Sequence, residues 1–242
     1  MPAILGTKLG MTRVFHEDGS QIPVTVVEAA PNTVTAIRKA DRDGYDAVQL
    51  AGIPTEERKL TKGQLGHLKK AGAKSAMKKL VEFRDVEFPK GLGGDSASPA
   101  NALQPDTPAG EAEDVAEEVS DGEAGPKVGD VVTVAAFEAG DKVKISAISI
   151  GKGFQGTVKR HNFSRGPVTH GSHNVRAPGS AGASADPARI FKGMKMPGQM
   201  GNKRATQEGA TVVSVDGERN LLLIRGSVPG GKNATLEVRS VG

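Results

Sequence analysis

One stretch of this 242-residue chain, residues 151–204, limits what the rest of it can be. It holds ten Lys and Arg residues against one acid, Asp186, and it spreads ten glycines and four prolines over its length without a sustained helical or strand period. A segment so polar and so rich in glycine buries too little apolar surface to offset the entropy that it loses on ordering. We therefore expect a partner to hold it, and its charge indicates a polyanion.

The net charge of +4 conceals an uneven distribution of acidic residues. Residues 91–125 carry nine acids and no Lys or Arg, which leaves 32 basic against 19 acidic residues in the rest of the chain. Their composition, rich in Ala, Gly, Pro and Ser, predicts a disordered acidic insertion on a surface loop. The default interpretation is a tolerated loop expansion; the alternative is that the insertion shields the basic surface before the true partner binds.

Composition excludes several classes of protein. Cysteine is absent, so there is no disulfide framework, no thiolate nucleophile and no cysteine-ligated zinc site. One Tyr, seven Phe and no Trp are too few for a protein that stacks successive single-stranded bases on aromatic rings. The longest aliphatic run, residues 221–224, is far too short to span a membrane. We expect no signal peptide and a cytoplasmic protein without membrane or small-molecule partners.

Short β-forming runs separated by turn residues dominate the remaining chain and predict a barrel or sandwich. The dipeptides Asp18-Gly19 and Asp216-Gly217 predict hairpins that join residues 11–15 to 22–28 and residues 210–215 to 220–225. A short helix is expected within residues 60–73, weakened by two glycines. Further strands are expected at residues 34–39, 45–53, 81–88, 128–137, 142–150 and 234–238.

Strands on both sides of the basic stretch are expected to share one core, because neither side has enough apolar residues alone. The basic stretch is then a two-legged excursion from a β-barrel, with a reach of at most ~90 Å for legs of about 27 residues. The predicted organisation has five parts: the first part of the barrel body with a short helical excursion (1–90), the acidic insertion (91–125), barrel strands (126–150), the basic extension (151–204) and closing barrel strands (205–242).

Two glycine motifs and three histidines suggest enzyme chemistry, but their surroundings do not fit. The G-x-G-x-x-G of residues 151–156 precedes no amphipathic helix and no suitably spaced acid, and the G-x-x-x-x-G-K of residues 226–232 is followed by Asn233 instead of Ser or Thr. His161, His170 and His173 have only Asp186 as a nearby acid, so we expect them to contact RNA instead of a metal. We predict no enzymatic activity, no cofactor and no metal.

Several motifs, in this order, resemble large-subunit ribosomal protein three (the L three family) of the bacterial type. They are residues 5–15 (LGTKLGMTRVF), 151–160 (GKGFQGTVKR), 169–172 (THGS), 178–180 (PGS), 191–193 (FKG), 198–202 (GQMGN) and 220–226 (NLLLIRG). The resemblance covers nearly the whole chain except residues 91–125. It implies a six-stranded translation-protein-type β-barrel on the surface of the large ribosomal subunit, next to other large-subunit proteins. It also implies a long loop threading into large-subunit rRNA towards the peptidyl transferase centre, and an early role in assembly.

By this resemblance the tip of the loop falls near residues 176–189, where the sequence departs from the family. Val175 precedes Arg176 where many members have His, and Ala181 replaces the usual Ile after the Pro-Gly-Ser motif. Some members carry a methylated Gln two residues before the tip proline; here that residue is Ala185, so the modification is not expected.

We predict rRNA contacts from sixteen residues. They are Lys8, Arg13, Lys152, Phe154, Lys159, Arg160, His161, Arg165, His170, His173, Arg176, Arg189, Lys192, Lys195, Lys203 and Arg204. The apolar side chains at positions 190, 191, 194, 196 and 200 have two open interpretations: they pack the legs of the loop together, or they lie against riboses. The alternative function is a free-standing basic nucleic-acid-binding protein, which would also bind duplex DNA. A nucleotide-dependent enzyme would need a helix after one of the glycine motifs.

Overall fold

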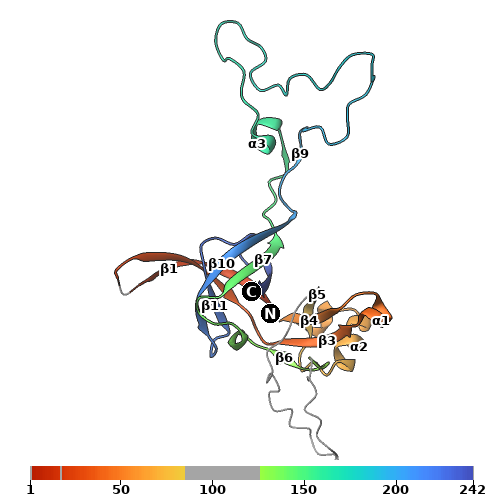
Figure 1. Cartoon of the computed structure of the whole chain (residues 1–242), viewed down its shortest axis with the longest axis vertical. Helices are drawn as coiled ribbons and strands as arrows, with labels where there is room; N and C mark the ends of the chain where they lie inside the picture. The colour runs from red at the N-terminus through yellow and green to blue at the C-terminus, as the bar shows by residue number, and fades with distance from the viewer. Residues whose placement is uncertain (1, 17, 85–125, 242) are drawn as a thin grey trace, which may run out of the picture.

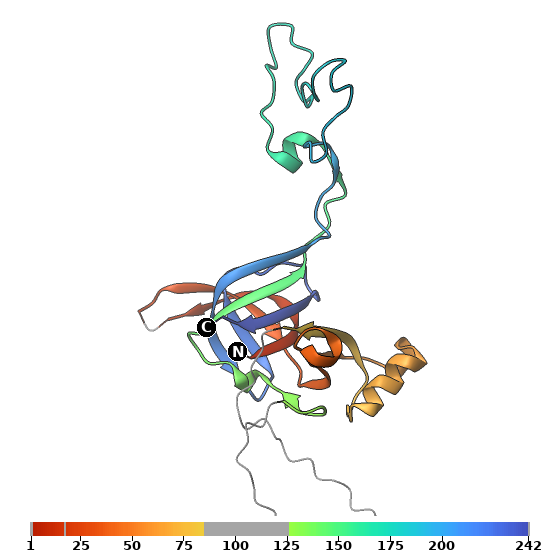
Figure 2. The same ribbon diagram turned by 45° about the vertical axis from the view of Figure 1, so that its right-hand side comes forward.

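The computed structural model describes residues 2–16, 18–84 and 126–241 of the chain (Figures 1 and 2). It has three parts: a β-barrel, a second sheet beside the barrel, and an extension that rises from one end of the barrel (Figure 1). The acidic insertion and the last residues of the strand predicted at 81–88 lie outside the described residues. No helix in the described ranges is long and apolar enough to cross a bilayer.

Six antiparallel strands close into a barrel in the order β1-β12-β7-β10-β11-β2. This confirms the mainly-β fold with a six-stranded barrel. Both predicted hairpins are present, since β1 pairs with β2 and β10 pairs with β11. Closure leaves the barrel without a free sheet edge. The strands are β1 (Ala3–Phe15), β2 (Gln21–Glu28), β7 (Lys142–Ile148), β10 (Arg204–Asp216), β11 (Leu221–Arg225) and β12 (Thr235–Ser240).

Alternating apolar residues fill the barrel interior, as the period of a strand requires. On β7, Val143, Ile145 and Ala147 point inward and are buried. The same core takes side chains from strands on both sides of the basic stretch, which confirms that those strands share one core. Its largest members are Ile4, Ile145, Leu222, Ile224 and Leu236.

A second antiparallel sheet has the order β5-β4-β3-β6, with β3 (Asn32–Arg38), β4 (Ala47–Pro54), β5 (Met77–Phe83) and β6 (Val131–Val132). Of the elements that the sequence analysis assigned to the barrel body, β3 to β6 thus lie in a separate sheet. The strand expected at residues 128–137 is reduced to β6, because the chain turns after it into the 3₁₀ segment η2 (Val134–Ala136). Val134 and Phe137 then enter the barrel core.

Strand β1 separates two cores because its successive side chains face opposite sides. Ile4 lies in the barrel core, whereas Ala3 and Leu5 lie in the core of the second sheet, which includes Leu50 and Phe83. Asn32 of β3 is fully buried at this junction and donates a hydrogen bond from Nδ2 to the Leu5 carbonyl at 3.2 Å.

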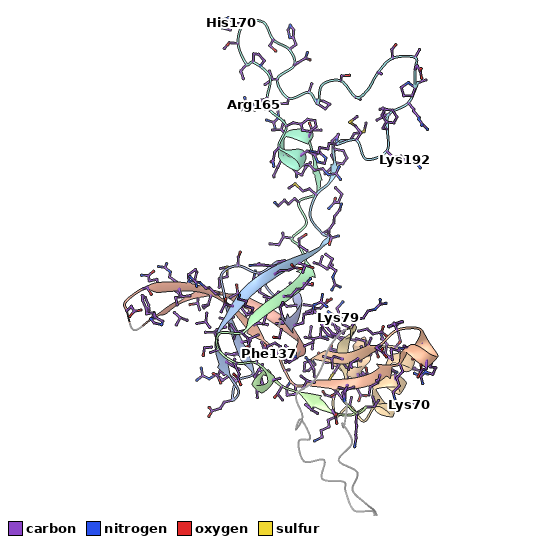
Figure 3. All side chains as sticks on the ribbon, in the orientation of Figure 1. Lys70, Lys79, Phe137, Arg165, His170 and Lys192 are labelled. Carbon is purple, nitrogen blue, oxygen red and sulfur yellow. The ribbon has the colours of Figure 1, made fainter. Side chains whose placement is uncertain are left out.

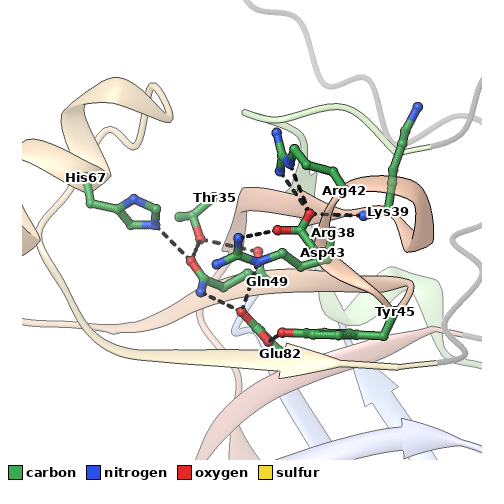
Figure 4. Close-up of polar contacts among 9 residues, drawn as sticks. All are labelled: Thr35, Arg38, Lys39, Arg42, Asp43, Tyr45, Gln49, His67 and Glu82. Atoms are coloured by element: carbon green, nitrogen blue, oxygen red, sulfur yellow. Dashed lines mark hydrogen bonds and ion pairs between the residues drawn. The ribbon is translucent and has the colours of Figure 1, made fainter.

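Helix α2 (Lys62–Lys70) covers the second sheet, where Leu68 packs with Ala51 and Met77. It follows the 3₁₀ turn η1 (Glu57–Lys59) and begins with a capping box, in which Thr61 and Gln64 each bond the other's backbone N–H. The box explains how so short a helix forms despite two glycines. From its middle, the His67 ring Nε2 lies 2.8 Å from Oε1 of Gln49 on β4 (Figure 4).

The short helix α1 (Ala40–Asp43) is fixed to the sheet by charged groups (Figure 4). Arg38 Nη1 donates to Asp43 Oδ1 at 2.9 Å. Partial burial raises the pKa of the Asp43 carboxyl, but hydrogen bonds from Arg42, the Lys39 N–H and Arg38 outweigh that effect and hold the pKa below its ordinary value.

The junction between the cores predicts a steric requirement for glycine at position 52. A Cβ added there would lie 2.3 Å from Asn32 Oδ1 and 2.8 Å from Leu5 Cβ, and both neighbours are fully buried. We expect Gly52→Ala to lower the free energy of unfolding by about 1–3 kcal/mol, measured by urea denaturation. In the matched control Gly10→Ala the new Cβ meets nothing within 4 Å, so a change of less than about 0.5 kcal/mol is expected. Equal stability of the two variants would contradict the requirement.

Candidate nucleic-acid interface

The extension leaves the barrel between the end of β7 and the start of β10, and backbone hydrogen bonds join its two legs at once (Figure 1). The Ser149 N–H donates to the Lys203 carbonyl at 2.9 Å, and the Lys152 N–H donates to the Met200 carbonyl at 2.8 Å. Strands β8 (Phe154–Gln155) and β9 (Gly198–Gln199) then pair. The legs therefore form a neck, residues 149–156 and 198–203, directly above the barrel.

Gly201 allows the two legs of the neck to approach closely. Its φ of +70° lies in the left-handed region, and a Cβ at this position would be 2.1 Å from the Ile150 carbonyl oxygen. Both facts require a residue without a side chain.

A clamp closes the neck at its outer end. Helix α3 (Thr157–His161) presents Arg160 and His161 to the opposite leg: Arg160 Nη1 donates to the Met196 carbonyl at 2.6 Å, and His161 Nε2 lies 2.9 Å from the same oxygen. Gly198 leaves room for this contact, since a Cβ there would lie 2.8 Å from Arg160 Nη1. No amphipathic helix is predicted from the sequence after the glycine motif, and α3, with five residues, is too short to show a helical period.

Beyond the clamp, residues 162–197 follow an irregular path far from the barrel. Figure 3 shows Arg165, His170 and Lys192 spread along this apical part, well separated from Phe137 in the barrel core. Few backbone bonds join it internally; one runs from the Gly166 N–H to the Val175 carbonyl at 3.1 Å. A hollow of about 690 Å³ opens beside Arg165. The apical part thus presents side chains and backbone on nearly all sides.

The cations of the extension are almost entirely uncompensated. Within the described residues only Arg204 forms an ion pair, with Glu237 on the barrel, and the other nine have no carboxylate partner. Arg160 is half-buried in the clamp. The other eight are exposed: Lys152, Lys159, Arg165, Arg176, Arg189, Lys192, Lys195 and Lys203. An array of this kind binds phosphates by releasing their counterions.

Apolar side chains in the extension are also exposed. Phe154 is 75% exposed and Phe191 57% exposed, and Ile190, Met194 and Met196 also face solvent, while Met200 is half-buried in the neck. The Arg189 guanidinium lies 6.0 Å from the centre of the Phe191 ring. Since the legs do not bury most of these side chains against each other, the geometry favours the interpretation in which they contact a partner.

The three histidines have different surroundings. His161 belongs to the clamp, whereas His170 and His173 are exposed in the apical part. Across the described ranges no three His, Asp or Glu side chains lie close enough together to hold a metal ion.

Two predicted contact residues lie outside the extension. Lys8 lies below the neck and is 9% exposed, and its ammonium donates to the Val228 and Gly230 carbonyls at 3.0 Å each. Arg13 lies on the part of β1 that pairs only with β2 and projects from the barrel as a ribbon; its guanidinium donates to Gln21 at 3.2 Å. Two of the three ammonium donors of Lys8 are thus used inside the protein, and its contact with rRNA stays a prediction.

Comparison with known proteins relates this chain to one protein family. The sequence model of the family described as Ribosomal protein L3 matches residues 115–220. The large ribosomal subunit protein uL3 of Acaryochloris marina is 45% identical over 236 residues, which cover 98% of this chain and 94% of that protein. The protein of the same name from Alkalilimnicola ehrlichii is 44% identical over 238 residues, or 98% and 93% of the two chains, and that of Synechococcus elongatus is 42% identical over 235 residues, or 97% and 93%. The similarity therefore includes the barrel, the second sheet and the extension.

The neck predicts a local effect of Gly201→Ala. The substitution forces a left-handed φ on alanine and a clash with the Ile150 carbonyl, so we expect the legs to separate and the Lys152 and Met200 amides to exchange hydrogen faster. Amides of the barrel strands should keep their protection. Gly151→Ala is the matched control, because its Cβ would make an ordinary 3.6 Å contact with Asn202. Identical exchange in the two variants would show that the neck does not depend on Gly201.

Proposed function

Because this chain belongs to the ribosomal protein L3 family, we propose that it is a structural constituent of the large ribosomal subunit and that its extension binds large-subunit rRNA. The barrel would lie at the subunit surface in the cytoplasm, next to other large-subunit proteins. The extension would run inward through the RNA. Its role is structural, and the chemistry of the ribosome belongs to the RNA.

The observation that carries this proposal is the set of nine cations that have no carboxylate partner among the described residues, on a thread that is narrow and rich in glycine. Folded RNA brings phosphate backbones together at helix junctions, where their repulsion must be offset and where a bulky domain does not fit. A thread of exposed Lys and Arg meets both conditions. Arg165, Arg176 and Arg189 add planar, bidentate contacts to phosphate that lysine does not make.

The part of the extension near the barrel and the apical part are held differently, which supports different roles for them. The neck and clamp fix where the extension leaves the barrel, while the apical part has few internal bonds to fix its own path. An apical part of this kind is ordered by its partner, so it would form its final structure together with the RNA. We infer an early role in assembly and support of the region around the peptidyl transferase centre, in agreement with the family resemblance.

Sedimentation of tagged protein from a lysate tests the proposal. We expect it to travel with the large subunit and to resist a high-salt wash, because a threaded extension cannot leave without opening the RNA. A surface binder with ~6–10 phosphate contacts would lose roughly 10³–10⁵ in affinity between about 50 and 200 mM salt. Release by the wash, or protein that stays at the top of the gradient, would instead favour a free-standing nucleic-acid-binding protein.

Substitutions along the extension should separate two effects. We expect Arg176→Ala and Arg189→Ala, in the apical part, to slow peptide-bond formation and to change antibiotic sensitivity, with subunit yield nearly unchanged. Lys152→Gln with Lys159→Gln, near the neck, should mainly delay appearance of the large subunit in pulse-labelled cells. Normal peptide-bond formation and antibiotic sensitivity in the apical variants would refute the proposed role at the catalytic region.

A further inference from the structure

We propose that the outer face of α2 is a second RNA-binding surface, separate from the extension, that docks on the phosphate backbone of large-subunit rRNA. This inference rests on the proposed function and adds a contact on the second sheet. Four observations support it: charge, helical geometry, two glycines without an internal role, and a hollow beside the helix that Lys70 lines.

The segment around α2 is strongly basic. Residues 58–81 contain eight Lys and Arg residues and no acid. Arg58 and Lys59 pair with Glu56, but Lys62, Lys69 and Lys70 are exposed and form no ion pair within the part of the chain that the structure describes. The helix therefore carries three uncompensated positive charges.

These charges share one side of the helix. At about 100° per residue, Lys62, Lys69 and Lys70 fall within one arc of about 100° on the side away from the buried Leu68, and the half-buried Leu65 lies at the edge of this arc. Figure 2 shows α2 on the outer side of the second sheet, away from the barrel, and Figure 3 shows Lys70 at this edge of the molecule. A partner can approach the three lysines without touching the extension.

Gly63 and Gly66 lie on this same outer side. Glycine is among the least favourable residues inside a helix, yet a Cβ added at either position would meet no atom of the described residues within 4 Å. The packing of the protein therefore does not require these glycines. Their effect is to leave the helix backbone bare between the lysines, so that a phosphate-ribose chain can approach closely.

A hollow of about 310 Å³ extends this surface from the end of α2 towards β3, and Arg42, His67 and Lys70 line it. None of its lining residues in the described ranges is Asp or Glu, but Arg42 is paired with Asp43, so Lys70 supplies the uncompensated positive charge of the hollow. The helix is held in place by the capping box and by the contact of His67 with Gln49 (Figure 4), so the surface is formed before a partner binds. A hollow lined in this way is suited to an anionic group.

The composition of the outer face favours RNA over other polyanionic or apolar partners. In the described residues this face presents Lys and Gly, with the half-buried Leu65 at its edge, whereas a helix lying on a membrane inserts a broad apolar face. Lysine is depleted from the buried centres of protein interfaces. An RNA backbone needs only the positive charges and the close approach that this face provides.

Hydroxyl-radical footprinting of the full chain on large-subunit rRNA, at several salt concentrations, tests the inference. We expect two separate sets of protected nucleotides. The triple variant Lys62→Gln, Lys69→Gln, Lys70→Gln should lose one set and lower the salt slope of binding by about 2–3, in proportion to three lost phosphate contacts. The charge-matched control Lys142→Gln, Arg219→Gln, Arg225→Gln, on the barrel, should keep both sets.

Gly66→Gln separates binding from folding. It should keep or raise the thermal midpoint of unfolding, because it removes a poor helix residue, and yet weaken protection of the same nucleotides, because its side chain covers the bare backbone.

A wild-type footprint and salt slope in the α2 triple variant would overturn the inference. The proposed function would still stand if the extension variant Arg165→Gln, Arg176→Gln, Arg189→Gln lost the nucleotides that the extension protects. If the α2 variant bound naked rRNA normally but failed to enter the subunit, the inference would be overturned in favour of a protein neighbour at α2. A wild-type protein that binds no rRNA would overturn both.

Discussion

Both cores of the protein depend on the alternation of side chains along the start of β1. Ile4 points into the barrel and Leu5 into the second sheet, so one short run of backbone is the wall of two cores. Because a shift of one residue would exchange these faces, the register of β1 with β12 fixes both cores together. Gly52 and Asn32 pack against each other at the same wall, where a Cβ at position 52 would not fit. The barrel and the second sheet therefore behave as one support.

The extension depends on that support through backbone contacts. It contributes no residue to the three apolar clusters of the described chain, and its order near the barrel comes from paired N–H and carbonyl groups and from the clamp on the Met196 carbonyl. Each such hydrogen bond contributes only about 1 kcal/mol net, so this order fades with distance from the barrel. The neck and the clamp therefore set the direction of the extension, whereas the partner determines the path of the apical part.

The sequence predicted those features that depend on local chemistry. Asp-Gly dipeptides predicted both barrel hairpins, and a β-forming run predicted the strand at residues 142–150 that became β7. The separate sheet was not predictable from periodicity, because residues 32–35 of β3 are all buried and show no alternation that could assign them to one core. The internal hydrogen bonds of Lys8 could not be predicted either: they join it to residues more than 200 positions away, and only the fold brings the Val228 and Gly230 carbonyls to its ammonium. The clamp escaped detection because its acceptor is a backbone carbonyl, which any residue carries.

The neighbouring positions of β1 and β12 in the barrel have a consequence for the order of synthesis. The chain emerges from its N-terminus, so β1 must wait for β12 before its first residues find their partner strand. The basic extension precedes β10, β11 and β12 and is complete while the barrel is still open. At roughly 5–20 residues per second, that interval lasts roughly 2–7 s. During these seconds the nascent chain presents the basic extension while its barrel is still open. The extension is therefore most exposed to nonspecific polyanions before folding is finished.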